Sequence, residues 1–420
     1  MLLRSGPAVL PRPATRNGSR EIEALRCEVP QRPSDSRRLK IAYVHDGLYP
    51  YFKGGAERRF FKTAHSLAER HDVTYISWQY WDGPSRMTRS GVSYVGVGRT
   101  PGFYGTDGKR TIRESLDFAR RVVGVLQQDK FDVIDCCATP LLALYVSRLV
   151  TRLRHEPLVV TWHEYWKDYW DTYLPHRPVV ARVAKALESR AVPLADTIVA
   201  VSEFTADKLR SRAPNTPIRV VGNGVSLEEI DAVPAEQGAP CVVFAGRLID
   251  DKKVDWLLQA VSEVTKTIPS LTCGIIGDGP ERARLESLAG ELELSSQVRF
   301  FGFVEEDRLY ALLKGSKVFV LPSVREGFGM SVVEAQACSS VPIVVRAPYN
   351  AAATLLRNEV DGLICQPCPG SLADAIRRLL TDSKLRREMS KNARRSAEQR
   401  EWSQIASQLE EIYTSVVASK

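Results

Sequence analysis

From residue 39 onward, short apolar runs alternate with longer segments in which apolar residues recur at helical spacing. Runs of four to six residues rich in Val, Ile and Leu predict strands, and a period of 3.6 predicts helices. The first such unit is a strand at 40–45, a loop closing on Gly54-Gly55, and a helix with Phe60 and Leu67 on its apolar face. Repeated alternation of this kind is typical of a parallel sheet covered by helices.

The pattern divides the chain into two such series. The first predicts further strands at 73–77, 92–97, 131–135, 158–162, 197–201 and 218–221, with helices at 111–128, 139–153, 178–192 and 203–212. The second predicts strands at 241–245, 271–276, 298–301, 317–321, 342–345 and 362–365, with helices at 253–267, 280–292, 305–314, 330–338 and 370–381. Between them, residues 231–240 carry Pro, Gly and polar residues without periodicity, as linkers do.

We therefore predict an α/β protein of two Rossmann-like, doubly wound domains that face a cleft. The N-terminal domain covers 39–230 and the C-terminal domain 241–398. A final helix within 399–420 is expected to cross back over both domains. The length of 420 residues agrees with two cores, because one core seldom exceeds about 300 residues.

The distribution of charge sets the N-terminal segment apart from the two predicted domains. The net charge is +8, and residues 1–40 contribute nine Lys and Arg against four acids, a net of +5. Residues 1–38 are rich in Pro, Arg and Ser with little apolar content, which predicts a disordered basic leader rather than a nucleic-acid surface. No nucleic-acid partner is expected.

The apolar runs and cysteines bear on location. The run 8–10 is too short for a secretory signal, and no later run reaches the length of a membrane span. Eight cysteines are scattered, mostly inside apolar runs, as in a reducing compartment. The pair Cys365 and Cys368 lacks a second Cys or His pair to complete a metal site, so no metal and no cofactor are predicted. The sequence favours a cytoplasmic protein.

Candidate chemistry gathers where strands of the second domain end. Arg247 and Lys252 follow its first strand, and two cations there can neutralise a diphosphate. The turn Gly277-Asp278-Gly279-Pro280 follows its second strand, with Pro280 expected at the first helical position. Taken alone, the cations could belong to a solvated loop.

The segment 319–334 carries the strongest signal. A strand leads into Glu326, Gly327 and Gly329, and then into a helix with Glu334. Glycines leave backbone amides bare at a helix N-terminus, which favours an anion, and an early helical carboxylate can accept hydrogen bonds from ribose. The two glutamates could also be the acid and base of an inverting glycosidase, since roughly 8 to 10 Å along the helix axis does not exclude it. Twin Rossmann-like domains with a phosphate cradle argue against hydrolysis.

In the first domain, Gly54-Gly55 opens a helix and His163 ends a strand. Glycine amides can approach a phosphate or a sugar, although a simple helix cap explains the pair equally well. A histidine at a strand end is more often structural than functional.

These residues resemble the retaining family-4 glycosyltransferases of GT-B fold, over nearly the whole chain from about residue 39. The resemblance lies in GGAER at 54–58, His163, AVSEFT at 200–205, NGV at 223–225, AGRL at 245–248 with Lys252, GDGP at 277–280, and EGFGMSVVE at 326–334, the E-x7-E motif of the family. It implies transfer of a hexose-type sugar from a nucleotide-diphosphate sugar to a glycan or lipid-linked acceptor, with retained configuration and without a metal.

The resemblance also implies roles for individual residues. Glu326 and His163 would be catalytic, with His163 contacting the transferring sugar. The donor would be bound by Gly55, Arg247, Lys252, Gly327, Phe328, Gly329, Met330 and Glu334. Arg247 and Lys252 would hold the pyrophosphate, Gly55 would lie beside it, and Glu334 would bind ribose.

Two departures concern the donor side. Lys253 replaces a glycine that usually follows the lysine, and APYNAAA at 347–353 replaces a Gly-Gly turn with a nearby acid. The aromatic segment 162–173 has no family counterpart; it is either an acceptor platform or core.

Other interpretations stay open. The chain could be a non-catalytic nucleotide-sugar-binding protein or a GT-B-fold nucleotide-sugar epimerase, whereas a missing GxGxxG disfavours a nicotinamide dehydrogenase. Basic residues among apolar ones at 148–154 and 182–190 suggest peripheral contact with the inner face of the cell membrane, against the alternative of a solvated face.

Overall fold

The computed structural model describes residues 37–103 and 110–420, so the predicted leader at 1–38 lies outside the described part except for its last two residues. The chain divides into two compact units. The first comprises the chain up to Val199, Leu209–Arg219 and Ala406–Lys420, and the second comprises Ala200–Lys208 and Val220–Ile405.

The first unit is built on an eight-stranded sheet in the order β3-β4-β2-β1-β5-β6-β7-β8. Its strands are β1 (Lys40–Val44), β2 (Asp72–Ser77), β3 (Arg86–Arg89), β4 (Val92–Gly96), β5 (Val133–Cys137), β6 (Leu158–Trp162), β7 (Thr197–Ala200) and β8 (Ile218–Val220). Its helices are α1 (Gly55–Ala68), α2 (Ile112–Gln128), α3 (Leu141–Arg154), α4 (Tyr169–Tyr173), α5 (Pro178–Ala191) and η1 (Val192–Leu194), and α6 (Glu203–Arg210) spans the boundary of the two units.

Most predicted elements of this unit are confirmed, with two exceptions at strands. The strand predicted at 131–135 begins two residues later, because Asp132 turns aside to accept a hydrogen bond from the Lys40 amide at 2.8 Å. Strand β3 was not predicted, since its sequence RMTR has no apolar run. It is the antiparallel edge of the sheet, and among the described strands it pairs with β4 alone.

The C-terminal helix α14 (Trp402–Ala418) begins in the second unit and continues into the first. There it is fastened by a buried polar network. The Tyr413 hydroxyl donates to Asp135 Oδ2 at 2.6 Å, and Thr161 donates to Oδ1 of the same carboxylate at 2.8 Å. Burial raises the pKa of Asp135, although these hydrogen bonds act in the opposite direction. The predicted return of the last helix is confirmed.

The second unit has a six-stranded sheet in the order β11-β10-β9-β12-β14-β16, with parallel pairing. Its strands are β9 (Val242–Ala245), β10 (Cys273–Ile276), β11 (Val298–Gly302), β12 (Val318–Leu321), β14 (Val341–Val345) and β16 (Leu363–Cys365), with a separate pair β13 (Arg325–Glu326) and β15 (Tyr349–Asn350). Its helices are α7 (Leu227–Ala232), η2 (Asp250–Lys252), α8 (Val254–Thr265), α9 (Arg282–Glu291), α10 (Glu306–Gly315), α11 (Met330–Ala337), η3 (Ala351–Leu355), α12 (Pro369–Thr381) and α13 (Ser383–Glu398).

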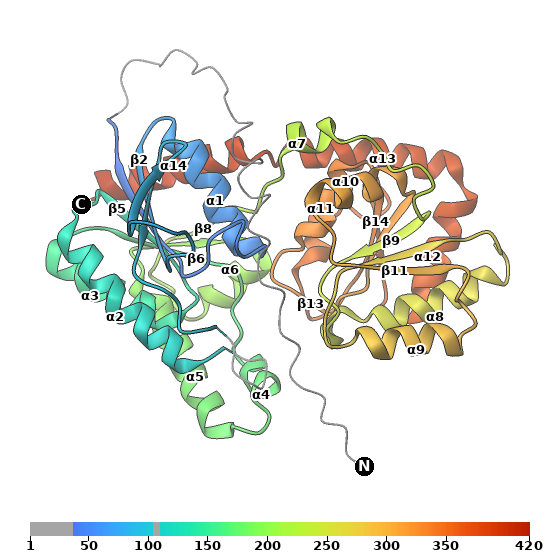
Figure 1. Ribbon diagram of the computed structural model, residues 1–420, viewed down its shortest axis with the longest axis horizontal. Coiled ribbons are helices and arrows are strands. Elements are labelled where there is room, and N and C mark those ends of the chain that lie inside the picture. Colours follow the sequence, from blue (N-terminus) through green and yellow to red (C-terminus); the bar gives the residue numbers. More distant parts are fainter. Residues whose placement is uncertain (1–36, 104–109) are drawn as a thin grey trace. The chain divides into compact units, whose positions relative to one another are not determined.

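Helices cover both faces of this second sheet. Figure 1 shows α8, α9 and α12 on one side and α10, α11 and α13 on the other. Strands β9, β12 and β14 are buried throughout and form the centre of the core. Helix α7 extends into the predicted linker and ends at Ala232, its second residue. The prediction that Pro280 begins a helix is wrong, because residues 280 and 281 form a turn and α9 starts at Arg282.

Candidate functional site

Lys252 and Glu326 form an ion pair at the carboxyl end of the second sheet. Lys252 ends the short helix η2, and its ammonium donates to Glu326 Oε1. The same turn is tied to the neighbouring segment by the Val324 amide, which donates to the Asp251 carbonyl at 2.9 Å. Arg247 lies in the loop that follows β9, and its side chain is exposed. The fold therefore brings together two predicted site residues, Lys252 and Glu326, that are 74 residues apart in the sequence.

Glycines allow two loops of this edge to pack backbone against backbone. Gly277 has φ +127°, and a Cβ placed on it would lie 1.9 Å from the Gly246 carbonyl oxygen. A Cβ on Gly279 would lie 2.3 Å from the Leu248 carbonyl oxygen. The amide of Leu248 donates to the Asp278 carbonyl at 2.9 Å. The GDGP turn thus supports the loop that carries Arg247.

Glu326 is positioned by the short parallel pair β13–β15, in which it lies opposite Asn350. Asn350 is buried, and both polar groups of its side-chain amide form hydrogen bonds. Its Nδ2 donates to the carbonyls of Ser323 and Val345 at 2.8 and 2.9 Å, and its Oδ1 accepts from the Ala352 amide at 2.9 Å. The departure APYNAAA is therefore an ordered support for Glu326, built on one asparagine that the sequence analysis did not single out.

The loop after Glu326 is fixed by its own glycine and by two contacts. Gly329 has φ +106° and precedes α11, where a Cβ would lie 2.7 Å from the Ala352 Cβ. Phe328 is buried, and a Cβ on Gly222 would lie 3.1 Å from its ring. The Ser202 hydroxyl donates to the Gly327 carbonyl at 3.0 Å. The motif AVSEFT thus supplies a support for the loop.

Glu334 is the fifth residue of α11 and is only 4% exposed. Met330 is the first residue of the same helix and is half-buried. Glu326, Gly327, Gly329 and Met330 therefore follow one another from β13 into the start of α11, as the sequence predicted.

In the first unit, buried and half-buried titratable side chains lie near the carboxyl ends of β1 and β6. Helix α1 begins at Gly55, and the Glu57 side chain folds back so that its Oε2 would lie 2.2 Å from a Cβ on Gly54. Glu57 Oε1 lies 3.6 Å from Nε2 of His45. Burial raises the pKa of Glu57, but His45 outweighs it, and the pKa lies below its usual value. A carboxylate of the chain itself therefore lies at this helix N-terminus.

His163 follows β6 and lies 6.2 Å from Phe60, centroid to centroid. Its Nε2 is buried and has no hydrogen-bond partner among the described residues. Burial, with Arg59 and His45 nearby, lowers the pKa of His163 from 6.5 to about 3. The imidazole is neutral at ordinary pH, so it can exchange hydrogen bonds but cannot act as a charged acid.

A cluster that the sequence analysis missed surrounds Asp46, just beyond β1. Arg110 pairs with Asp46 and lies 3.3 Å from Glu114 Oε2. Glu114 accepts from Trp78 Nε1 at 2.7 Å and is fully buried. Burial and Asp46 raise the pKa of Glu114. No local spacing could have signalled this cluster, because Asp46 and Arg110 are 64 residues apart.

Comparison with known proteins decides the family. Residues 53–229 match the family described as Glycosyltransferase Family 4, and residues 208–396 match the family described as Glycosyl transferases group 1. The chain belongs to glycosyltransferase family 4.

Two relatives illustrate the extent of this similarity. An uncharacterized glycosyltransferase of Methanocaldococcus jannaschii is 26% identical over 89% of this chain and 98% of its own length. A D-inositol 3-phosphate glycosyltransferase of Salinispora arenicola is 31% identical over 55% of this chain and 57% of its own length.

Solved structures show the fold. Sucrose-phosphate synthase from Thermosynechococcus elongatus aligns with a TM-score of 0.75 at 21% identity, covering 91% of this chain and all of the other. The Anabaena protein Alr3699/HepE, solved with UDP and glucose, aligns with a TM-score of 0.68 at 21% identity, covering 90% and 100%. The fold of this family-4 glycosyltransferase is GT-B, as predicted.

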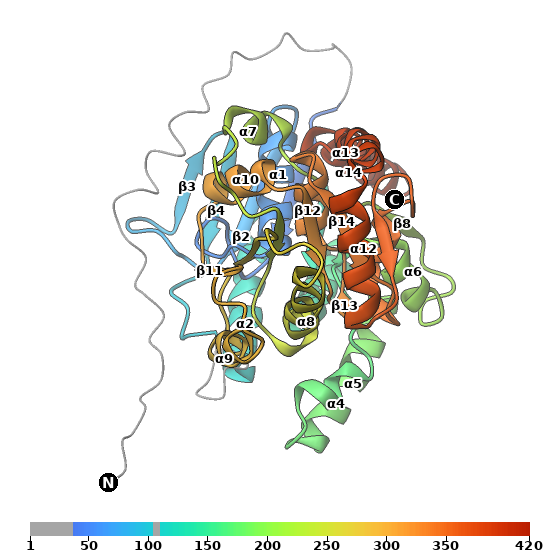
Figure 2. The same cartoon turned by 90° about the vertical axis from the view of Figure 1, so that its right-hand side faces the viewer.

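In the aromatic segment of the glycosyltransferase, Trp162 and Tyr165 belong to the core, whereas four other aromatic side chains do not. Trp166, Tyr169, Trp170 and Tyr173 are half-buried and contact one another with ring centroids 4.7 to 6.5 Å apart. Helix α4, which carries three of them, lies alongside α5 (Figure 2). Buried Glu188 of α5 accepts from the amides of residues 166 and 167 at 2.8 Å and from Trp170 Nε1 at 3.1 Å. The rings are thus held rigidly, and their role as a platform stays a prediction.

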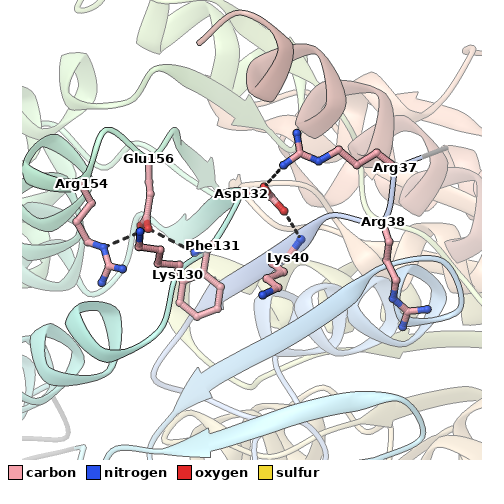
Figure 3. A pocket seen from close by; sticks show the side chains of 8 residues that line it. All are labelled: Arg37, Arg38, Lys40, Lys130, Phe131, Asp132, Arg154 and Glu156. Carbon is pink, nitrogen blue, oxygen red and sulfur yellow. Dashed lines mark hydrogen bonds and ion pairs between the residues drawn. The ribbon is translucent and has the colours of Figure 1, made fainter.

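A basic hollow of about 430 Å³ lies elsewhere in the first unit of the glycosyltransferase, where β1 and β5 begin (Figure 3). Two of its cations are already paired: Arg37 with Asp132 at 2.8 Å, and Arg154 with Glu156 at 3.2 Å. Ligands of parallel sheets bind at the opposite ends of the strands. This hollow is therefore not assigned to the site.

Proposed function

We propose that this family-4 glycosyltransferase moves a hexose-type sugar from a nucleotide-diphosphate sugar to a glycan or lipid-linked acceptor, with retention of configuration. The observation that carries the proposal is the ion pair between Lys252 and Glu326 at the carboxyl end of the second sheet. It joins a cation suited to a diphosphate with a carboxylate suited to sugar hydroxyls.

In the proposed donor complex, the diphosphate replaces Glu326 as the ion-pair partner of Lys252. Arg247 adds a second, forked contact to the phosphates, which its exposed side chain can reach. Glu326, released from the ammonium, accepts hydrogen bonds from the sugar. The amides of 327–330 lie at the start of α11, where the helix dipole favours a negative group. Glu334 binds ribose.

The reaction breaks the bond between the anomeric carbon and the diphosphate oxygen. The acceptor hydroxyl oxygen forms the new bond on the same face of the sugar, and its proton passes to the leaving diphosphate. Positive side chains stabilise the charge that develops on that leaving group. Arg247 and Lys252 supply this charge, so no metal is required.

On the first unit, His163 is proposed to contact the transferring sugar. Support comes from its buried Nε2, which finds no partner among the described residues and so has a hydrogen bond to offer a ligand. Gly55 is proposed to lie beside the diphosphate. That placement requires the Glu57 carboxylate, which now lies in front of Gly54, to turn away.

The acceptor class and location are also proposals. Relatives named Alpha-D-kanosaminyltransferase and 2-deoxystreptamine glucosyltransferase, 27% identical each, support a hexosyl-type transfer to a hydroxyl-rich acceptor. The described cysteines are all free, which supports a cytoplasmic location. No helix of the described residues has the length and apolar character needed to cross a bilayer.

The first experiment is a thermal-shift screen with UDP, GDP, ADP and their sugar conjugates, with EDTA present. A ligand at 100 times its dissociation constant adds about 2.7 kcal/mol to stability. A shift with one nucleotide names the donor base. A failure of every nucleotide to shift the transition would contradict the donor site, or would point to a donor outside the screen.

Glu326→Gln tests the assignment of that residue. We expect turnover to fall by about 100-fold or more, since an interaction with the reacting sugar is lost. Affinity for the nucleoside diphosphate should stay equal or increase, because Lys252 is no longer neutralised. Glu388→Gln, at an exposed position of α13, is the control and should change neither quantity. Turnover of Glu326→Gln at the wild-type rate would refute the assignment.

A further inference from the structure

Exposed apolar side chains are concentrated on three helices of the first unit. Ten large apolar residues of the described chain are exposed, and six of them lie on α2, α3 and α5. They form three pairs at i, i+4 spacing: Ile112 and Leu116, Leu149 and Leu153, Val179 and Val183. Single exposed apolar residues are normal, but repeated pairs on neighbouring helices mark an interaction surface.

Helices α3 and α5 touch where the first turns of α3 meet the last turns of α5. The Tyr145 hydroxyl on α3 donates to the Leu187 carbonyl on α5 at 2.8 Å. Both helices lie on the same face of the first sheet in Figure 1. Leu153 and Val179 are 71% and 70% exposed, the highest values among the large apolar residues. We call Leu149, Arg152, Leu153, Val179, Arg182 and Val183 the α3–α5 patch.

The charge of this patch has one sign. Helix α3 contains no Asp or Glu, and the one acid of α5, Glu188, is buried and turned toward α4. Arg152 and Arg182 are exposed and make no ion pair with any described residue. Other cations of the region are already engaged: Arg148 with Asp196, and Lys185 with Asp168 and Asp171.

We propose that the α3–α5 patch is a docking surface for anionic lipid. Apolar side chains enter the boundary between headgroups and acyl chains, while adjacent cations contact the headgroups. A second copy of the chain fits poorly, because a two-fold contact would bring Arg152 and Arg182 against cations of the same patch. The proposal does not depend on the donor chemistry.

Helix α13 offers an internal comparison. It is also strongly basic, with Arg387 and Arg395 exposed, but none of the ten exposed large apolar residues lies on it. If net positive charge alone attracted lipid, α13 would contribute as much as the patch. If apolar insertion is required, only the patch contributes.

The test is cosedimentation of the full chain with vesicles of phosphatidylcholine alone and of equal parts phosphatidylcholine and phosphatidylglycerol. We expect binding to the anionic vesicles, weakening with added salt. R152Q/R182Q should lower the partition coefficient about 25-fold, since each cation near the surface contributes about fivefold. L149S/L153S should lower it at least about tenfold, and R387Q/R395Q should leave it unchanged.

All these positions are exposed, so each variant should keep the wild-type melting temperature, which is measured alongside. Equal binding to neutral and anionic vesicles would overturn the proposal. So would wild-type binding by the patch variants, or an equal loss in R387Q/R395Q. Sedimentation velocity completes the test: self-association that L149S/L153S abolishes would assign the patch to a second copy instead.

Discussion

In the second unit, the ends of the strands are held by backbone packed against backbone, whereas in the first unit they are held by buried charged side chains. Gly277 and Gly279 touch the carbonyls of the loop after β9, and the ion pair of Lys252 with Glu326 lies at the same edge of the sheet. Around β1 of the first unit, half-buried Arg110 joins the buried carboxylates of Asp46 and Glu114 in an ionic cluster. The strand ends of the second unit therefore form a rigid cradle, whereas the stability of those of the first unit depends on the protonation states of side chains.

The largest effect is expected from Gly277→Ala, which breaks the cradle. The new Cβ would lie 1.9 Å from a carbonyl oxygen at a φ of +127°, so the two loops must separate. We expect a loss of more than about 4 kcal/mol from the stability of the second unit. Calorimetry should show its transition at a much lower temperature.

Gly290→Ala is the matched control for that change. Gly290 lies in α9 and a Cβ there meets nothing within 4 Å. Alanine should raise stability by up to about 1 kcal/mol. If both variants melt like the wild type, the close approach of the two loops does not stabilise the unit.

The next effect concerns Arg247, which lies in the loop that the two glycines contact. Arg247→Ala should weaken binding of the nucleoside diphosphate by about 2 kcal/mol, the lower end of the range for a desolvated pair, since the side chain is exposed in the free chain. Lys266→Ala removes the same charge beyond the far end of α8 and should change nothing. Calorimetric titration measures both, and unchanged affinity in Arg247→Ala would move the phosphate site elsewhere.

The edge of the first unit should respond to acid. Below pH 6.5 the unfolded chain binds a proton at His163, while the folded chain does so only near pH 3. Stability therefore falls as the pH drops below 6.5, by up to roughly 1.4 kcal/mol for each pH unit. The second unit contains no described histidine.

His163→Gln should remove much of this dependence. Urea unfolding at about pH 5 and about pH 7 measures it, with the exposed His176→Gln as control. In that window Glu57, with its lowered pKa, is still ionised in the folded state. An equal acid response in wild type and His163→Gln would show that the buried imidazole is not its cause.

The contrast between the edges also explains what the sequence could predict. Periodic apolar runs located nearly all long helices and central strands, but β3 and β13 are short and polar and give no such signal. The donor-side motifs were found because glycines constrain the backbone within a few residues. The Asp46, Arg110 and Glu114 cluster was not found, since its members meet only through the fold. Asn350 stood in a segment that the sequence marked only as a departure.

The smallest effect concerns the other departure, Lys253. It has φ +46° and precedes α8, a left-handed conformation that costs an L residue roughly 1 kcal/mol and that glycine adopts freely. Lys253→Gly should therefore raise the stability of the second unit by about 0.5 kcal/mol, after the loss of the Asp250 ion pair and the greater entropy of glycine. Lys253→Ala loses the same ion pair without relieving the backbone and should not stabilise. If glycine and alanine lower the melting temperature equally, then the ion pair rather than the backbone decides this position, and the departure from glycine carries no cost in stability.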